Sequence, residues 1–104
     1  MVVNKKGDME AMIGILLRKS SEYGERLDCA IYLGEYDNYL AEQALFEVAM
    51  DVAEDEDLVE NCVESLARIW LQRGRINDFI FNALPEIYQA RVLVIFRAPG
   101  AETP

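Results

Sequence analysis

Histidine is absent from this chain of 104 residues, and cysteine occurs only twice. Without histidine, the sequence lacks the commonest general base and the commonest metal ligand of proteins. The two cysteines, Cys29 and Cys62, are too few for a disulfide framework, and each lies in an apolar series where a thiol packs as a small core residue. We therefore expect no catalytic residue, no metal and no cofactor, and a protein that is not an enzyme.

The acidic stretch that begins at Asp51 is the candidate for a cation site. An EF-hand loop needs Gly at its sixth position and Glu at its twelfth position. Counted from Asp51, these positions hold Glu56 and Cys62, so the calcium motif is absent. An enzyme that uses clustered carboxylates with a divalent metal remains as a third hypothesis of function, which a metal-dependent thermal shift would support.

Long apolar runs are also missing. The longest contain five residues, at 29–33 and 92–96. A membrane-spanning helix needs about 20 apolar residues, and the first residues show no apolar stretch of a signal peptide. We expect a cytoplasmic protein with no membrane partner.

Basic residues are missing from the middle of the chain. Between Leu27 and Ala67 there is no Lys or Arg, whereas twelve residues are Asp or Glu, and the net charge of the whole chain is −9. This balance disfavours direct binding of nucleic acid or anionic lipid and favours a basic protein partner. Surfaces usually mix both signs of charge, so the stretch predicts a binding surface. Helix capping and solubility are the alternative explanation.

Apolar residues recur every three or four positions, which is the spacing of one helical face. The pattern predicts a single all-α domain over residues 1–97, with five or six helices in antiparallel pairs, and a C-terminal tail at 98–104. The expected helices cover about 9–19, 21–34, 39–52, 58–73, 78–84 and 85–97. The β-branched run at 92–96 leaves strand open as well as helix, but no other segment offers a partner strand, so we expect a helix there.

Local signals mark the ends of these helices. The expected N-caps are Asp8, then Ser20 or Ser21, then Asp37 or Asn38, then Asp57 in a capping box with Glu60, and finally Asn77 or Asp78. Gly74 is expected to follow the fourth helix and Pro85 to begin the last one. Trp70 continues an apolar series and is expected in the core.

A weak repeat underlies the helices. A shift of 33 residues aligns Cys29 with Cys62 and Leu33 with Leu66, and a helix pair that recurs at this period is typical of a solenoid. Residues 55–69 resemble the second helix of a short HEAT-like repeat, although Val59 stands where that family usually has Arg. The resemblance covers about residues 22–97 and implies a short right-handed array of helix pairs. A tetratricopeptide pair is the alternative fold.

The segment from Glu64 to Trp70, the chain length and the acidity also resemble small α-helical bacterial immunity proteins with HEAT-like helices. Those proteins neutralise the toxin domains of contact-dependent growth-inhibition systems. The resemblance implies a protein that binds a basic toxin domain, a nuclease, and occludes its substrate groove with an acidic helical face. The alternative is a HEAT-like adaptor that binds a peptide or protein partner, with no toxin. The oligomeric state stays open.

The residues expected to contact this partner are ten acids and two tyrosines. They are Asp37, Glu42, Glu47, Asp51, Glu54, Asp55, Glu56, Asp57, Glu60 and Glu64, with Tyr36 and Tyr39. We expect the acids to form one continuous negative surface, through which association would be fast and sensitive to salt. The tyrosines are candidates for interface anchors.

Overall fold

A computed structural model describes residues 5–97, and every regular element in that range is a helix. The helices are α1 (Lys5–Leu17), α2 (Tyr23–Leu33), α3 (Tyr39–Ala49), α4 (Glu56–Arg73), α5 (Asp78–Ala83) and α6 (Glu86–Phe96). The predicted all-α fold with five or six helices is confirmed. The run at 92–96 lies in α6, so the helix prediction is confirmed there too, whereas the predicted tail at 98–104 lies outside the described residues.

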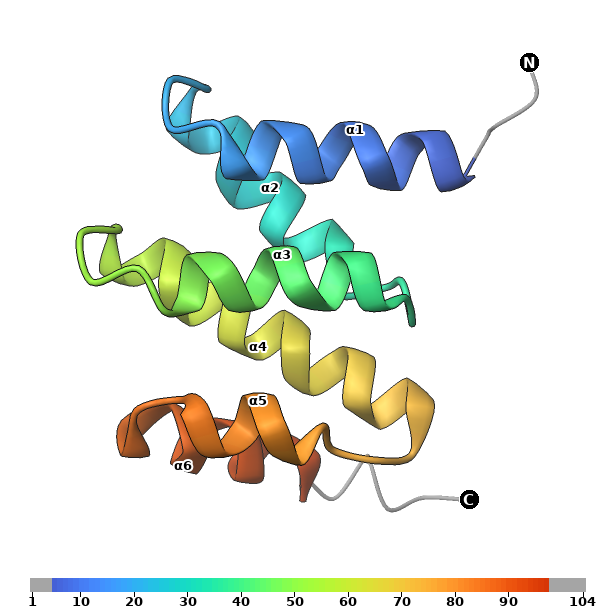
Figure 1. Ribbon diagram of the computed structural model, residues 1–104, viewed down its shortest axis with the longest axis vertical. Helices are drawn as coiled ribbons and strands as arrows, with labels where there is room; N and C mark the ends of the chain where they lie inside the picture. The colour runs from blue at the N-terminus through green and yellow to red at the C-terminus, as the bar shows by residue number, and fades with distance from the viewer. Residues whose placement is uncertain (1–4, 98–104) are drawn as a thin grey trace.

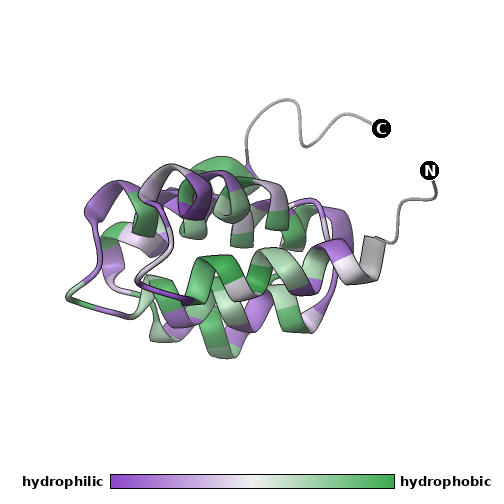
Figure 2. Cartoon of the chain, turned by 90° about the horizontal axis from the view of Figure 1, so that it is seen from above, coloured by the Kyte–Doolittle hydropathy of each residue, from purple (hydrophilic) through white to green (hydrophobic). Residues whose placement is uncertain are grey.

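The helices form three antiparallel pairs in two layers (Figure 1). One layer contains α1, α3 and α5, and the other contains α2, α4 and α6. Besides the contacts within the first two pairs, α4 packs against both α2 and α6. Hydrophobic segments of both layers face the space between them (Figure 2). The long helix α4 is therefore the centre of the packing.

Helices of one layer run in the same direction, and this gives the molecule two distinct ends (Figure 1). At one end lie the α1–α2 turn (18–22), the α3–α4 turn (50–55) and the start of α6; we name this the turn end. At the opposite end lie the α2–α3 connector (34–38) and the α4–α5 connector (74–77); we name this the connector end. The N-termini of α2, α4 and α6 all lie at the turn end.

Several predicted helix boundaries are confirmed by the capping geometry. The Asn38 side chain accepts a hydrogen bond from the Leu40 amide at 2.8 Å, and the Asn77 side chain accepts one from the Ile80 amide at 3.1 Å. Gly74 ends α4 in the left-handed conformation with φ of 77°. Glycine adopts this conformation without a Cβ penalty.

Other predicted caps are wrong. The cap of α4 is Asp55, which accepts a hydrogen bond from the Leu58 amide at 3.0 Å, because the backbone of the predicted cap Asp57 is already helical. The cap of α2 is Glu22, with no side-chain hydrogen bond, in place of Ser20 or Ser21. Likewise α1 begins at Lys5, so Asp8 lies within its first turn.

Residues of α4 lie at the centre of the hydrophobic core. Trp70 is fully buried, as predicted, and both cysteines are buried and free. The end of α2 lies close to α4 at Gly34, where an added Cβ would lie 2.5 Å from Arg68 Nη2 and 2.8 Å from Ser65 Oγ. A side chain at position 34 fits only if Arg68 or Ser65 shifts, and Ser65 Oγ donates to the Ala30 carbonyl oxygen at 2.5 Å.

Candidate protein-binding site

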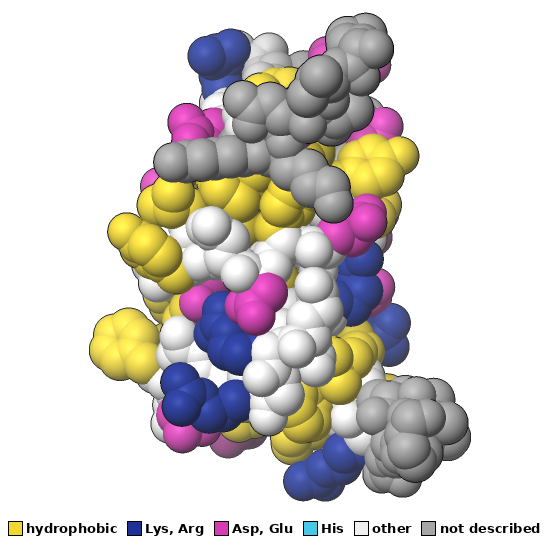
Figure 3. Space-filling view, turned by 90° about the vertical axis from the view of Figure 1, so that its right-hand side faces the viewer, with side chains coloured by type: hydrophobic (Ala, Val, Ile, Leu, Met, Phe, Trp, Pro, Cys, Tyr) yellow, Lys and Arg dark blue, Asp and Glu magenta, His cyan; other side chains and the backbone are white. Residues whose placement is uncertain are grey.

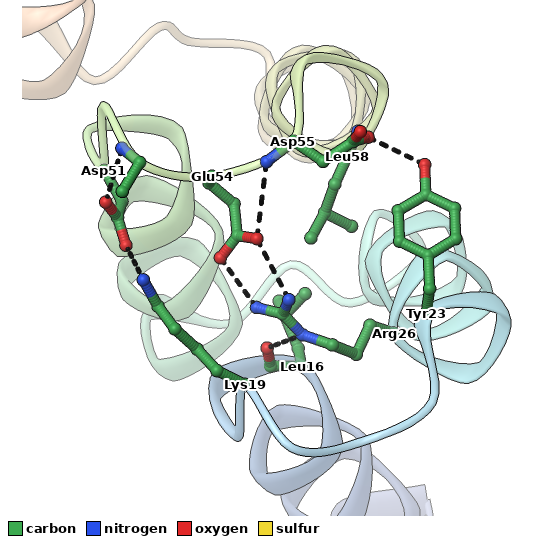
Figure 4. Close-up of polar contacts among 9 residues, drawn as sticks. Leu16, Lys19, Tyr23, Arg26, Asp51, Glu54, Asp55 and Leu58 are labelled. Carbon is green, nitrogen blue, oxygen red and sulfur yellow. Dashed lines mark hydrogen bonds and ion pairs between the residues drawn. The ribbon is translucent and has the colours of Figure 1, made fainter.

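A group of polar contacts joins the first two helix pairs at the turn end (Figure 4). Arg26 donates from its two terminal nitrogens to the two carboxylate oxygens of Glu54 at 3.0 and 2.8 Å, and from Nε to the Leu16 carbonyl oxygen at 2.9 Å. The side chains of Arg26 and Glu54 are only 7% and 9% exposed. The bidentate pair and the third hydrogen bond together compensate the buried charges of both side chains. Glu54 therefore holds two helix pairs together and does not face a partner.

Two further contacts lie beside this pair. Lys19 Nζ is 2.6 Å from Asp51 Oδ2, and the Tyr23 hydroxyl donates to Asp55 Oδ2 at 2.8 Å. These hydrogen bonds lower the pKa of both aspartates, and the bond to Asp55 raises the pKa of Tyr23 to about 12. Asp51 and Asp55 thus have partners within the chain.

The connector end contains a second polar group. Glu42 is 2% exposed, and its carboxylate accepts from Trp70 Nε1 at 2.6 Å and from Arg73 Nη1 at 3.0 Å. Arg73 also donates from Nε to Asp37 at 3.0 Å. Glu42 was predicted to belong to the negative partner-binding surface, but it lies in the core, at the opposite end of the molecule from the α3–α4 turn.

These contacts show that several acids of the base-free stretch 27–67 are paired with bases from the rest of the chain. The partners of its acids come from outside it: Lys19 and Arg26 from before it, Arg73 and Arg91 from after it. Six of the ten predicted acids are bonded in this way or to Tyr23: Asp37, Glu42, Asp51, Glu54, Asp55 and Glu64. The continuous negative surface expected from all ten is therefore interrupted by internal pairs.

Four predicted acids have no ion pair among the described residues. Glu56, Asp57 and Glu60 are exposed in the first two turns of α4, and Glu47 is exposed on α3. The predicted tyrosines do not join them: Tyr36 is half-buried and Tyr39 is exposed, and both lie at the connector end. The structure thus brings the three α4 acids together and separates them from the aromatic pair.

The turn end also carries acids that sequence analysis missed. Glu22 and Glu25 at the start of α2, and Glu86 at the start of α6, are exposed at the same end as the α4 acids. Around the turn end, nine acids (Glu22, Glu25, Asp51, Glu54, Asp55, Glu56, Asp57, Glu60 and Glu86) outnumber three bases (Arg18, Lys19 and Arg26). The sequence does show acids at the start of every second helix. Because these helices begin at the same end of a two-layer stack, this recurrence could have predicted the acidic turn end.

The connector end carries charges of both signs. Figure 3 shows the connector end, where Lys and Arg side chains lie among apolar ones over much of the lower half. Arg68, Arg73 and Arg75 belong to this region of α4 and the connector that follows it. Glu35, Asp37 and Asp78 lie at the same end, so acids and bases are mixed there, whereas acids predominate at the turn end.

A notch of about 470 Å³ opens at the turn end between the second and third helix pairs. Its lining comes from the α3–α4 turn, the start of α4 and the start of α6: Ala49, Met50, Asp51, Val52, Glu54, Glu56, Val59, Pro85 and Tyr88. Val52 is fully exposed at its mouth. Burial raises the pKa of Tyr88, and the charges of Glu56 and Glu60 raise it further, so the hydroxyl lies in a negative field.

No family model, curated protein or solved structure matches this chain. The relation to HEAT-like immunity proteins expected from the sequence therefore stays a prediction.

The chemistry available elsewhere in the described residues is limited. No group of three or more His, Cys, Asp or Glu side chains within residues 7–97 is arranged to hold a metal ion. Burial raises the pKa of the Cys62 thiol to about 12 and also raises the pKa of Cys29. Thiols in such settings are inert because the nucleophile is the thiolate. In the same part of the chain, no helix is long and apolar enough to span a membrane.

Proposed function

We propose that this chain is a non-enzymatic immunity protein that binds a basic toxin domain, a nuclease, through its turn end. The observation that carries the proposal is the excess of carboxylates there, of which six have no ion pair among the described side chains: Glu22, Glu25, Glu56, Asp57, Glu60 and Glu86. A nuclease must present a positive groove to the phosphates of its substrate. An acidic helical end is complementary to such a groove and excludes the substrate without chemistry.

The internal ion pairs support this mechanism. Arg26 and Lys19 fix the α3–α4 turn against α2, so the acids at the helix starts are held on a rigid frame before a partner arrives. A preorganised surface loses little conformational entropy on binding. The excess of acids at the turn end would also raise the association rate with a basic partner at low salt.

Co-purification tests the proposal. The tagged chain is expressed with the C-terminal fragment of the protein encoded just upstream, and the pair is purified at low salt. We expect a stoichiometric complex that dissociates as salt rises, and a fragment that is toxic alone but harmless with the chain. A fragment that is neither toxic nor retained would contradict the immunity function.

A groove between α1 and α3 favours a second candidate, a HEAT-like adaptor. This groove of about 460 Å³ is lined by Ile13, Leu17, Leu40, Gln43 and Ala44, with Glu10 and Glu47 as its acidic members. Leu17 and Leu40 are both partly exposed, and an apolar groove of this kind suits an amphipathic helix. Binding that is insensitive to salt but lost in Leu40→Asp would favour the adaptor over the immunity protein.

A further inference from the structure

At the turn end, three polar contacts join the first and second helix pairs, and no such contacts join the second and third pairs there among the described residues. The ion pair between the second and third pairs, Arg91 with Glu64, lies farther along α4 and α6. The three pairs can be aligned on the N-cap residues of α2, α4 and α6, which are Glu22, Asp55 and Pro85. In the first contact, Arg26 lies four residues after the N-cap, Tyr23 one residue after it and Lys19 three residues before it. Each of these donors bonds to an acid of the following turn.

None of these ties has a counterpart in the second contact. Four residues after the N-cap of α4 stands Val59 in place of Arg26, and three residues before it stands Val52 in place of Lys19. The acceptors change as well: the residue before the N-cap is Glu54 in the first contact and Leu84 in the second, and the N-cap itself changes from Asp55 to Pro85. We name the contacts of Arg26, Lys19 and Tyr23 with Glu54, Asp51 and Asp55 the polar clamp. In the second contact, apolar residues stand at the four positions compared above.

The notch lies at this second contact, where the polar clamp is missing. Val52, Val59 and Pro85, which stand at clamp positions, all line it. So does Glu56, which takes the place of Tyr23 and is an exposed carboxylate with no ion pair among the described side chains. The two other acids of the lining, Asp51 and Glu54, already have Lys19 and Arg26 as partners. Glu56 is thus the carboxylate of the notch that lacks a base.

We propose that the notch binds an arginine side chain of the basic partner, which supplies from outside the guanidinium that the second contact lacks. The aliphatic stem would lie along Val52 and Val59, and the guanidinium would pair with Glu56 beside the Tyr88 ring. Arginine suits this setting better than lysine because its planar group pairs bidentately with a carboxylate and stacks on aromatic rings. This inference rests on the proposed function for its choice of a basic protein as the partner.

The size and character of the notch agree with such an occupant. Its volume of about 470 Å³ falls in the usual range of ligand pockets, roughly 300–1,000 Å³. Long basic side chains bury their stems on apolar surface while the head stays near water. Met50 and Val52, both exposed at the mouth, supply that surface. A wholly apolar side chain would leave Glu56 and the Tyr88 hydroxyl without a bonding partner.

A peptide titration tests the inference without the partner. The isotope-labelled chain is titrated with acetyl-Gly-Arg-Gly-amide, and with the same peptide in which citrulline, the neutral isostere, replaces arginine. We expect saturable chemical-shift changes at the amides of Val52, Glu56 and Val59 with the arginine peptide, and binding at least tenfold weaker with citrulline. Equal binding of both peptides, or shifts confined to other surfaces, would overturn the proposal.

Two matched variants separate the notch from general acidity. Glu56→Lys and Asp57→Lys change the net charge equally at adjacent exposed positions in the first turn of α4, but Asp57 does not line the notch. We expect Glu56→Lys to abolish binding of the arginine peptide and Asp57→Lys to weaken it less than threefold. Equal losses would overturn the proposal. Because Lys is unfavourable at either helix-start position, thermal unfolding of both variants is compared, and Glu56→Gln provides a milder version.

The same pair distinguishes this inference from the proposed function. If the basic toxin domain binds the chain but Glu56→Lys and Asp57→Lys weaken that complex equally, the arginine site is wrong while the immunity function stands. If no basic domain is bound but the peptide titrates at the notch as expected, the immunity function is wrong while the arginine site stands.

Discussion

The Glu42 carboxylate accepts hydrogen bonds from both the Trp70 indole N–H, at 2.6 Å, and the Arg73 guanidinium, at 3.0 Å. One buried acid thereby ties the first turn of α3 to the last turns of α4. Asp37 contacts the same guanidinium from the α2–α3 connector. The connector end is thus fixed by a polar network whose members are 28 to 36 residues apart in the chain.

Glu42→Gln tests the strength of this network. The amide keeps an acceptor for the Trp70 N–H but removes the negative charge that faces Arg73, so we expect a loss of about 2 kcal/mol in the free energy of unfolding, measured by urea denaturation. Glu47→Gln, on the same helix but exposed, is the control and should change stability by less than about 0.5 kcal/mol. Similar small effects for both would show that Glu42 contributes no more than a surface acid.

Acid should destabilise the fold through the turn end. The pKa of Glu54 is lowered by its hydrogen bonds to Arg26, and that of Asp51 by its bond to Lys19. A carboxyl group whose pKa is lower in the folded than in the unfolded chain stabilises the fold above its unfolded pKa, near 4, and this stability is lost as the pH falls through the folded value. We therefore expect stability to fall below about pH 5, measured by urea unfolding at a series of pH values.

The Glu54→Gln variant is the matched comparison for this pH dependence. It lacks the carboxyl group that titrates against Arg26, so its stability should be lower at pH 7 and should change less between pH 7 and pH 3 than that of the parent chain. If the stability of the variant falls as steeply toward pH 3 as that of the parent chain, the pH dependence comes from other carboxylates.

The close approach of α2 and α4 predicts opposite effects for two glycine substitutions. In Gly34→Ala the new Cβ would lie 2.5 Å from Arg68 Nη2 and 2.8 Å from Ser65 Oγ, so one side chain must move and about 1–3 kcal/mol should be lost. In Gly14→Ala nothing lies within 4 Å of the new atom, and the change within α1 should add about 0.5–1 kcal/mol. Thermal unfolding measures both, and a stabilised Gly34→Ala variant would contradict the packing described here.

The buried thiols predict slow chemistry in the folded state. With its pKa raised to about 12 by burial, Cys62 holds almost no thiolate at pH 8, and Cys29 is buried with a raised pKa. We expect a thiol reagent such as dithionitrobenzoate to label neither cysteine within minutes in buffer and to label both at once in urea. Rapid labelling of the folded chain would mean that the core opens readily around α4.

Local sequence signals predicted the helix ends well where a single residue determines the backbone conformation around it. Asn38, Asn77, Gly74 and Pro85 mark helix ends because their side chains or allowed φ angles decide the matter locally. The cap of α4 was misassigned to Asp57 because four successive acids can all start a helix. Packing and the Tyr23 hydroxyl, neither of which is local, select Asp55.

The candidate site was harder to predict because it depends on contacts between distant segments. The sequence shows that 27–67 lacks bases, but not that Arg26 and Arg73 fold back to pair with Glu54 and Glu42. The acids that stay exposed at the turn end become visible only when α2, α4 and α6 are seen to start side by side. The predicted partner site therefore keeps Glu56, Asp57 and Glu60 at the turn end and gains acids from the neighbouring helices.

Salt dependence of binding by two charge-matched variants tests whether the turn end is the binding surface. One variant neutralises three turn-end acids (Glu25→Gln, Asp57→Asn and Glu60→Gln). The other neutralises three exposed acids away from the turn end (Glu10→Gln, Glu35→Gln and Asp78→Asn). The dissociation constant for the basic toxin domain is measured for each between 50 and 300 mM salt, roughly the range over which screening of surface charge strengthens. If the turn end is the binding surface, the first variant binds at least tenfold more weakly at low salt and with a shallower salt dependence, while the second stays close to the parent chain. Equal losses in the two variants, or an unchanged first variant, would contradict the account.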